Sequence, residues 1–255
     1  MKDNVVLEVS HLKKYFDLGH GRTLHAVDDV SFSIREGETL GLVDESGCGK
    51  TTCGRTCLGM YNKTDGQVLY RGKDVHALKG SELFAYKREA QMVFQDPYAS
   101  LDPRMTVSDI VAEGMDVHHL YKNKAERAEK IYGLLEKVGL AEKKAEYPCR
   151  LSGGQQARTA LARTLSHAKP LIVLDDPFAA LDRNTEEEIF RELKAMSKDR
   201  IILLISHRLY LFDQTDQVIW MENGQTQTGT HEKMLQIVPE YANLCKEWKE
   251  GADHA

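Results

Sequence analysis

Short apolar runs separated by turn residues dominate the first hundred positions of the chain. These runs are VVLEV (5–9), VSFSI (30–34), ETLGLV (38–43), VLYRG (68–72) and AQMVF (90–94). Short segments in which apolar residues cluster or alternate with polar ones are typical of β-strands. The third run leads into a glycine-bearing loop and then into helical sequence from Lys50 to about Leu58. The pattern therefore predicts a strand, a loop and a helix in that order.

The spacing becomes helical between about Met105 and Leu165. Apolar residues three and four positions apart recur in VSDIVAEGM (107–115), AERAEKIYGLLEKVGL (125–140) and QQARTALARTL (155–165), as on the buried face of an α-helix. Strand-like runs return at PLIVLDD (170–176) and RIILLISH (200–207), on either side of a helix predicted for NTEEEIFRELKAM (184–196). The chain is therefore predicted to be an α/β core interrupted by a helical insertion.

The last forty residues begin with a hairpin pattern. QVIWM (217–221) and QTQTGT (225–230) flank an Asn-Gly turn and are followed by polar helical sequence; Asn-Gly between alternating runs is a strong hairpin signal. We expect one domain over residues 1–255, with about 1–100 and 166–238 as the α/β core. About 101–165 would form a helical subdomain and 239–255 a helical tail.

Composition narrows the class of protein. The net charge of −5 leaves no excess of Lys and Arg for phosphates, which argues against a nucleic-acid partner. The longest apolar stretches, LIVL (171–174) and IILLI (201–205), are far shorter than the roughly 20 residues that cross a bilayer. The first residues lack the pattern of a secretory signal, and five cysteines without CxxC spacing fit a reducing compartment. We expect a soluble cytoplasmic protein.

The loop SGCGKTT (46–52) contains the residue types of a phosphate-binding site. Gly47 and Gly49 have no Cβ to keep phosphate oxygens away from the backbone N–H groups. Lys50 can reach the β- and γ-phosphates, and the Thr51 hydroxyl can bind Mg²⁺ at the start of the following helix.

Phosphate chemistry also needs a carboxylate from another strand. The run LIVLDD (171–176) delivers Asp175 to a strand end, where it can hold the Mg²⁺ hydration shell. Asp176 would then orient the attacking water. Each motif alone has an ordinary structural explanation, but their order on the predicted elements favours a nucleotide site.

Three further features identify a family. They are LSGGQQ (151–156), Gln95 at the end of QMVFQ, and His207 at the end of IILLISH. With the phosphate loop and the two aspartates, this set resembles the nucleotide-binding subunit of ABC transporters over essentially the whole chain. The resemblance implies a P-loop NTPase core, with a mixed sheet and flanking helices, an antiparallel β subdomain and an inserted α-helical subdomain. It also implies ATP and Mg²⁺ as cofactors.

The resemblance assigns roles to individual residues. Phe16 or its neighbour Tyr15 is similar to the aromatic residue that stacks on adenine. Gln95, with Thr51 and Asp175, would bind Mg²⁺, and Gln95, Asp176 and His207 would be the catalytic set. The residues expected to contact nucleotide are Tyr15, Phe16, Asp44, Glu45, Ser46, Gly47, Cys48, Gly49, Lys50, Thr51, Thr52, Ser152, Gly153, Gly154, Gln155 and Asp182.

The family resemblance also implies partners. Ser152, Gly153 and Gly154 resemble residues that meet the γ-phosphate of a nucleotide held by the opposite subunit, and Asp182 matches an aspartate that crosses between subunits. A second ATPase subunit, of the same or a different chain, is therefore expected. So are permease subunits at the cytoplasmic face of the membrane and an extracytoplasmic solute-binding protein.

The two halves of the chain resemble different groups within the family. ETLGLVDESGCGKTT (38–52) and MVFQDPYASLDPRMTV (92–107) are similar to the ATPases of oligopeptide, dipeptide and nickel importers. DDPFAALDRNTEEEIF (175–190) and LLISHRLYLF (203–212) look more like exporter ATPases. Import of peptides or nickel complexes is the leading expectation, and an exporter-type ATPase is the alternative. A soluble ABC protein of DNA repair or translation is a poorer match, because those resemble long coiled-coil ATPases or tandem cassettes.

Three positions depart from the family pattern. Asp44 stands where the family has a glycine, Asp176 where it has glutamate, and Ala179 where it has serine. A carboxylate about 5 Å from a phosphate charge would cost roughly 3 kcal/mol at an effective dielectric near 20, unless its side chain turned into water. A shorter Asp176 would lower turnover more than ATP binding. A slow ATPase is expected, or the weak half of an asymmetric dimer in which another subunit hydrolyses ATP.

Overall fold

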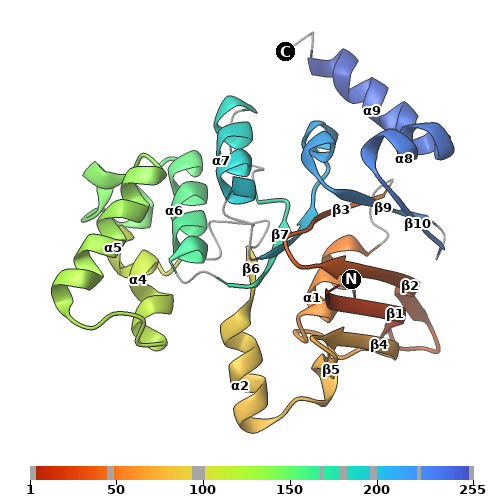
Figure 1. The fold of residues 1–255 in the computed structure, drawn as a ribbon, viewed down its shortest axis with the longest axis horizontal. Coiled ribbons are helices and arrows are strands. Elements are labelled where there is room, and N and C mark those ends of the chain that lie inside the picture. Colours follow the sequence, from red (N-terminus) through yellow and green to blue (C-terminus); the bar gives the residue numbers. More distant parts are fainter. Residues whose placement is uncertain are drawn as a thin grey trace.

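Two β-sheets form the centre of the fold, and helices pack against them and beside them (Figure 1). The computed structural model describes residues 4–44, 49–93, 101–166, 169–177, 183–195, 200–222 and 225–252. The strands are β1 (Val5–Asp17), β2 (Thr23–Arg35), β3 (Thr39–Asp44), β4 (Asp65–Tyr70), β5 (Lys73–Asp74), β6 (Ala90–Val93), β7 (Leu171–Asp175), β8 (Ile201–Ile205), β9 (Gln217–Glu222) and β10 (Gln225–Gly229). The helices are α1 (Lys50–Cys57), α2 (Gly80–Glu89), α4 (Val107–Val117), α5 (Lys124–Lys137), α6 (Gly153–Leu165), α7 (Arg183–Ala195), α8 (His231–Ile237) and α9 (Pro239–Ala252), with 3₁₀ turns at Val75–Ala77, Ala141–Lys143, Pro148–Arg150 and Leu209–Gln214.

The six-stranded sheet has the order β10-β9-β3-β8-β7-β6. All its neighbouring strands run parallel except β9 and β10, which form the antiparallel hairpin predicted from the Asn-Gly turn. Leu42 of β3 and Asp175 of β7 both lie opposite Ile205 of β8. The carboxyl ends of these three strands therefore meet at one edge of the sheet, where the sequence predicted a phosphate loop and paired aspartates.

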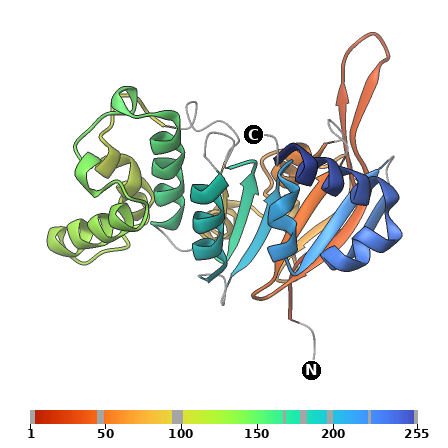
Figure 2. The same ribbon diagram turned by 90° about the horizontal axis from the view of Figure 1, so that it is seen from above.

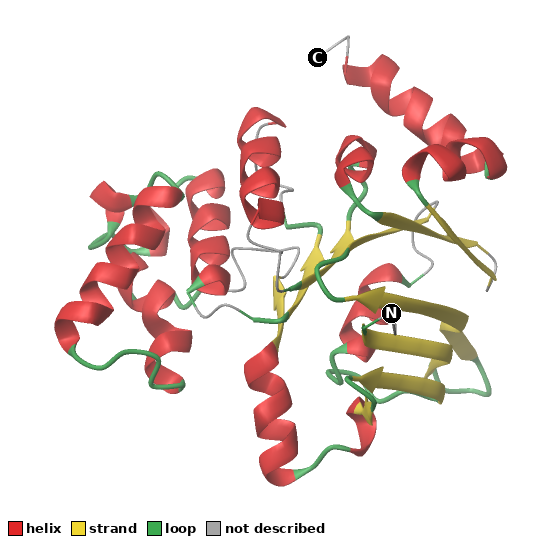
Figure 3. Cartoon of the chain, in the orientation of Figure 1, coloured by secondary structure: helices red, strands yellow, loops and turns green. Residues whose placement is uncertain are grey.

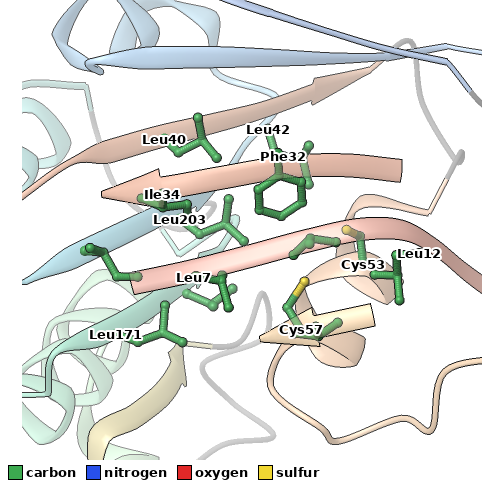
Figure 4. Packing of buried hydrophobic residues seen from close by; sticks show 14 of the residues in the cluster. Leu7, Leu12, Phe32, Ile34, Leu40, Leu42, Cys53, Cys57, Leu171 and Leu203 are labelled. Carbon is green, nitrogen blue, oxygen red and sulfur yellow. The ribbon is translucent and has the colours of Figure 1, made fainter. Parts of the chain in front are cut away.

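Every residue of β7 and β8 is buried because helices or strands cover both faces of the sheet. Successive side chains of a strand point to opposite faces. Leu171, Val173 and Leu203 accordingly pack with α1 and the second sheet, where Cys53 and Cys57 are also buried (Figure 4). Ile172 and Leu204 and their neighbours at even positions pack against α6 and α7 instead. This two-sided burial explains why both strands are continuous apolar runs rather than alternating ones.

The second sheet is antiparallel, with the order β2-β1-β4-β5. Its strand β1 extends over 13 residues, well beyond the run predicted at residues 5–9, because bulges let it pair with both β2 and β4. His11 lies at one such irregularity, with φ of 50°. The mixed sheet, the antiparallel sheet and the inserted helices together confirm the expected fold.

The helices α4, α5 and α6 pack around their own apolar cluster at one end of the molecule (Figure 2). Val107, Val111, Met115, Ile131 and Leu135 form much of this cluster. The helices α8 and α9 lie at the opposite end, beside β9 and β10 (Figure 3). Helix α2 was not predicted, because Tyr86 is its only buried residue and so its apolar spacing is weak.

Candidate functional site

The start of α1 requires glycine at position 49. Gly49 caps the helix with φ of 97°, a left-handed conformation that favours glycine. A Cβ on Gly49 would lie 1.6 Å from the backbone oxygen of Ala26. Lys50 and Thr51 follow as the first residues of α1, with Lys50 buried, so both lie at the helix end where backbone N–H groups and the dipole favour anions. Thr52 is the third residue of the same helix.

The Thr51 hydroxyl donates a hydrogen bond of 2.7 Å to Oδ1 of Asp175. This bond joins the helix that follows the glycine loop to the end of β7, as the sequence predicted. Asp175 is buried, and its second oxygen, Oδ2, has no hydrogen-bond partner among the described residues. Burial raises the pKa of Asp175, and the charge of Asp176 adds to that effect, while the Thr51 bond, Arg55 and His207 oppose it.

This pair fits a hard divalent cation. Mg²⁺ takes oxygen ligands and usually binds one or two carboxylates together with substrate phosphates and water. A buried carboxylate oxygen without a partner, next to a threonine hydroxyl, supplies that chemistry. No group of three or more His, Cys, Asp and Glu side chains in the described part of the chain could hold a metal alone. An ion here would therefore depend on phosphate ligands.

Asp176 is held by contacts from β8. Its backbone is left-handed, with φ of 45°, and its N–H donates to the oxygen of Ile205 at 2.7 Å. The Ser206 hydroxyl donates to Oδ1 of Asp176 at 3.1 Å and accepts from the N–H of Arg208 at 3.0 Å. His207 lies between these two residues and is exposed. The structure therefore brings Asp175, Asp176 and His207 to the same sheet edge. Ser206, which sequence reasoning missed, links Asp176 to the backbone that follows His207.

The two candidate adenine-stacking rings at the end of β1 have different surroundings. Tyr15 stacks on His25 with 3.9 Å between ring centroids and donates a hydrogen bond to Asp28, which raises the pKa of Tyr15 to about 12. Phe16 meets Tyr61 edge-on at 5.6 Å. His25 precedes Ala26, whose backbone oxygen adjoins Gly49. Tyr61 in turn accepts a hydrogen bond from Arg55 of α1 at 3.0 Å, so both ring pairs lie near α1.

The LSGGQ segment begins α6 with a reciprocal cap. The N–H of Gln155 donates to the Ser152 hydroxyl at 3.3 Å, and the N–H of Ser152 donates to the Gln155 side chain at 3.0 Å. Ser152 is exposed, and Gly153 and Gly154 form the first turn of the helix. The cap uses the N–H groups of Ser152 and Gln155, so an anion at this helix end would meet the N–H groups of Gly153 and Gly154.

A buried ion pair fixes the segment that follows His207. Glu186 of α7 is fully buried and accepts hydrogen bonds from Arg208 and from the Tyr210 hydroxyl. Burial raises the pKa of Glu186, and Asp176 adds a smaller repulsion. No local pattern marks Glu186 for burial, because it is the first of three consecutive glutamates in the helix predicted for residues 184–196.

Several predicted site residues lie outside the described residues. They are Glu45, Ser46, Gly47, Cys48, Gln95, Ala179 and Asp182. Asp44 is described as the last residue of β3, opposite Met221.

The family model and the curated proteins that match this chain agree with one another. The family model of the ABC transporter matches residues 27–179. The oligopeptide transport ATP-binding protein OppF of Bacillus subtilis (strain 168) is 48% identical over 208 residues, covering 80% of this chain and 68% of that protein. The dipeptide transport ATP-binding protein DppF of Lactococcus lactis subsp. cremoris (strain MG1363) is 44% identical over 225 residues, covering 84% and 72%.

Solved structures agree with the fold. The dimeric structure of MJ0796, a bacterial ABC transporter cassette, has a TM-score of 0.80 at 25% identity and covers 88% of this chain and 98% of that one. A dimeric post-hydrolysis state of the same cassette, bound to ADP and Pi, has a TM-score of 0.79 at 25% identity, with 87% and 97% covered.

Proposed function

The chain belongs to the ABC transporter family, and from that premise we propose that it is the ATP-hydrolysing subunit of a peptide importer. The observation that carries the proposal is the Thr51–Asp175 contact. It joins the start of α1 to a buried strand-end carboxylate whose second oxygen lacks a partner in the described structure. That arrangement fits a nucleotide with its Mg²⁺.

We propose a role in ATP hydrolysis for each of the candidate residues at the carboxyl ends of the parallel strands and at the start of α1. Lys50 would hold the β- and γ-phosphates at the start of α1, and Thr51 and Asp175, together with Gln95, would hold Mg²⁺. When bound, Mg²⁺ would neutralise charge on the β- and γ-phosphate oxygens. Asp176, oriented by Ser206, accepts a hydrogen bond from the attacking water, and His207 contacts the γ-phosphate. We propose the Tyr15–His25 stack as the surface for adenine.

The proposed site is completed by a second ATPase subunit. The exposed start of α6, with Ser152, Gly153 and Gly154, would contact the γ-phosphate of a nucleotide bound to the other subunit, and Asp182 would cross the interface. The relatives among solved structures are titled as dimers, which supports this arrangement. ATP would close the two subunits face to face, and hydrolysis would release them.

We propose that the permease binds in a groove between α2 and α4. The groove has a volume of about 910 Å³ and is lined in part by Met60, Tyr86, Met92 and Val117. Met60 and Val117 are 51% and 62% exposed, so this groove offers apolar side chains to a partner helix. No helix in the described ranges is long and apolar enough to cross a membrane.

Asp44, Asp176 and Ala179 depart from the family pattern, and for this reason we propose that the protein hydrolyses ATP slowly. Purified wild type, Asp44→Gly and Asp176→Glu would be compared for ATP affinity and turnover. We expect Asp44→Gly to tighten ATP binding, since it removes a carboxylate from the loop entrance. Asp176→Glu should raise turnover with little effect on affinity. If neither change has its effect, the proposal of a weakened site is wrong.

The cargo is proposed from the names of relatives. Several are named oligopeptide or dipeptide transport ATP-binding proteins, so we propose peptide import with a solute-binding protein outside the membrane. Nickel complexes and export are the alternatives from the sequence. Co-purification of the permease, followed by ATP-dependent uptake of labelled peptide or nickel into vesicles, separates them: uptake of nickel alone, or efflux of peptide, would overturn the peptide-import proposal.

A further inference from the structure

A cavity with cationic walls lies at the sheet edge opposite the proposed ATP site. It has a volume of about 580 Å³, within the range of small-molecule pockets. Its lining includes Phe84, Arg88, Glu89, His118, Leu120, Lys130, Ser166 and Lys169. These residues come from the end of α2, the segment after α4, α5, the end of α6 and the approach to β7. The cavity therefore adjoins the amino ends of β6 and β7, whereas Asp175 ends β7 at the other edge (Figure 1).

Positive charge predominates in this cavity. Three cations, Arg88, Lys130 and Lys169, face one carboxylate, Glu89. That carboxylate already accepts from the Tyr70 hydroxyl at 2.9 Å and lies 3.9 Å from the Arg71 guanidinium. Arg88 is exposed and forms no ion pair with a carboxylate of the described residues. Lys130 is already paired with Glu126 at 2.9 Å. With these two pairs set aside, Arg88 and Lys169 supply an excess of about two positive charges at the cavity wall.

Of the three cations, Lys169 has the charge that is most costly in free energy to bury. Only 3% of the residue is exposed, and its Nζ donates to the backbone oxygen of Lys87 at 3.2 Å. An ammonium group has three donors, so this bond satisfies one of them. Burial and, to a smaller extent, the nearby Arg88 lower the pKa of Lys169 to about 8, against the opposing effect of Glu89. An anion in the cavity would supply acceptors to the ammonium and relieve repulsion from Arg88.

The rim of the cavity is apolar and aromatic. Phe84 is 54% exposed, and its ring meets the His118 ring with 5.9 Å between centroids. Leu120 lies on the same cavity wall. A ligand with an anionic end at Lys169 and Arg88 would thus place its apolar part against this rim.

We infer that this cavity binds a phosphate monoester carrying an apolar group. A phosphate monoester carries close to two negative charges at neutral pH, which matches the excess positive charge of the wall. Guanidinium and ammonium groups are the usual partners of phosphate oxygens. The ester has two possible sources, a soluble metabolite or the headgroup of a monoester phospholipid. The inference does not rest on the proposed transport function.

Calorimetric titration with phenyl phosphate tests the inference in the full-length chain carrying Lys50→Ala, which removes phosphate binding at the proposed ATP site. We expect saturable binding that Arg88→Gln weakens by about tenfold or more. Arg22→Gln, a matched change at an exposed loop position, should leave the affinity unchanged. Lys169→Gln should also weaken binding. Because Arg88 is exposed, its variant remains informative even if the buried Lys169 variant fails to fold.

Vesicles distinguish the two sources of the ester. Flotation with phosphatidic acid vesicles, and with phosphatidylcholine as the reference, would be measured for the same variants. Binding of phenyl phosphate without selective retention by phosphatidic acid vesicles supports a soluble ligand. Retention by phosphatidic acid vesicles alone, lost in Arg88→Gln, supports a lipid headgroup. Absence of both, or equal binding by Arg88→Gln and Arg22→Gln, overturns the inference.

Discussion

The Asp176 carboxylate depends on Ser206 for its orientation. Ser206 is buried and donates to Asp176 at 3.1 Å, while the N–H of Arg208 holds the Ser206 hydroxyl in place. This hydrogen bond fixes the position of the short Asp176 side chain, which is proposed to orient water. Such positioning affects the rate more than binding, because a misplaced catalytic group slows the reaction while the substrate still binds. Ser206 thus acts as a positioning residue for the proposed reaction.

Ser206→Ala should lower the turnover of ATP by about three- to tenfold and leave ATP affinity nearly unchanged. Ser206→Thr keeps the hydroxyl and should restore most of the rate. Steady-state phosphate release and equilibrium nucleotide binding measure the two quantities. Equal losses in the alanine and threonine variants would instead indicate a packing role.

The lowered pKa of Lys169 makes the free energy of unfolding depend on pH. Its pKa falls from 10.5 to about 8 on folding, so between these values the unfolded chain binds more protons than the folded one. The contribution of Lys169 to the free energy of unfolding should therefore rise as pH increases from about 8 to 10.5. Below pH 8 Lys169 is protonated in both the folded and the unfolded state, so the folded protein bears the full free-energy cost of burying this cation.

Urea unfolding of the wild type and Lys169→Gln at several pH values measures this term. The free energy of unfolding of the wild type, relative to the variant, should rise across the window from about 8 to 10.5. A difference that stays constant with pH would contradict the assignment.

At the scale of elements, the ion pair of Glu186 with Arg208 ties α7 to the segment after β8. Removing one partner of a buried pair leaves the other charge uncompensated. Glu186→Ala should therefore lower the free energy of unfolding by about 3–5 kcal/mol. The neighbouring Glu187→Gln removes a partly exposed pair with Arg183 and should change it by about 0.5 kcal/mol or less. Urea denaturation of both variants provides the comparison, and similar small effects would mean that the Glu186 pair is not buried in solution.

Sequence patterns predicted the elements that have strong periodicity. β7 and β8 are continuous apolar runs, and the sequence between β9 and β10 contains an Asn-Gly pair, so all four strands were recognised. Helix α2 was missed because its sequence buries a single side chain. The full length of β1 was also missed, since its bulges arise from pairing with two neighbours.

Some residues of the candidate site could likewise be predicted from the sequence, and others could not. Lys50, Thr51 and Asp175 were predictable because parallel strands bring their carboxyl ends to one edge. The contacts of Ser206 and the burial of Glu186 depend on strand register and on packing of α7, which no local pattern in the sequence specifies.

At the scale of the whole molecule, the two opposite ends of the parallel strands have different chemistry. The carboxyl ends gather Asp175, Asp176 and His207 beside the start of α1, and the amino ends of β6 and β7 adjoin the cationic cavity. Helix α6 has Ser152 at its start, the residue proposed to contact the nucleotide of a second subunit, and Ser166 just after its end, in the wall of the cavity. A movement of the helical subdomain on nucleotide binding would therefore alter both regions.

Phosphate release from MgATP by the purified protein tests the central claim most directly. We predict slow, saturable release by the wild type that disappears in Lys50→Ala, because the phosphates lose their cation at the start of α1. ATP binding by the wild type with no release above that of Lys50→Ala would contradict the claim, and would indicate a subunit that binds nucleotide without hydrolysing it.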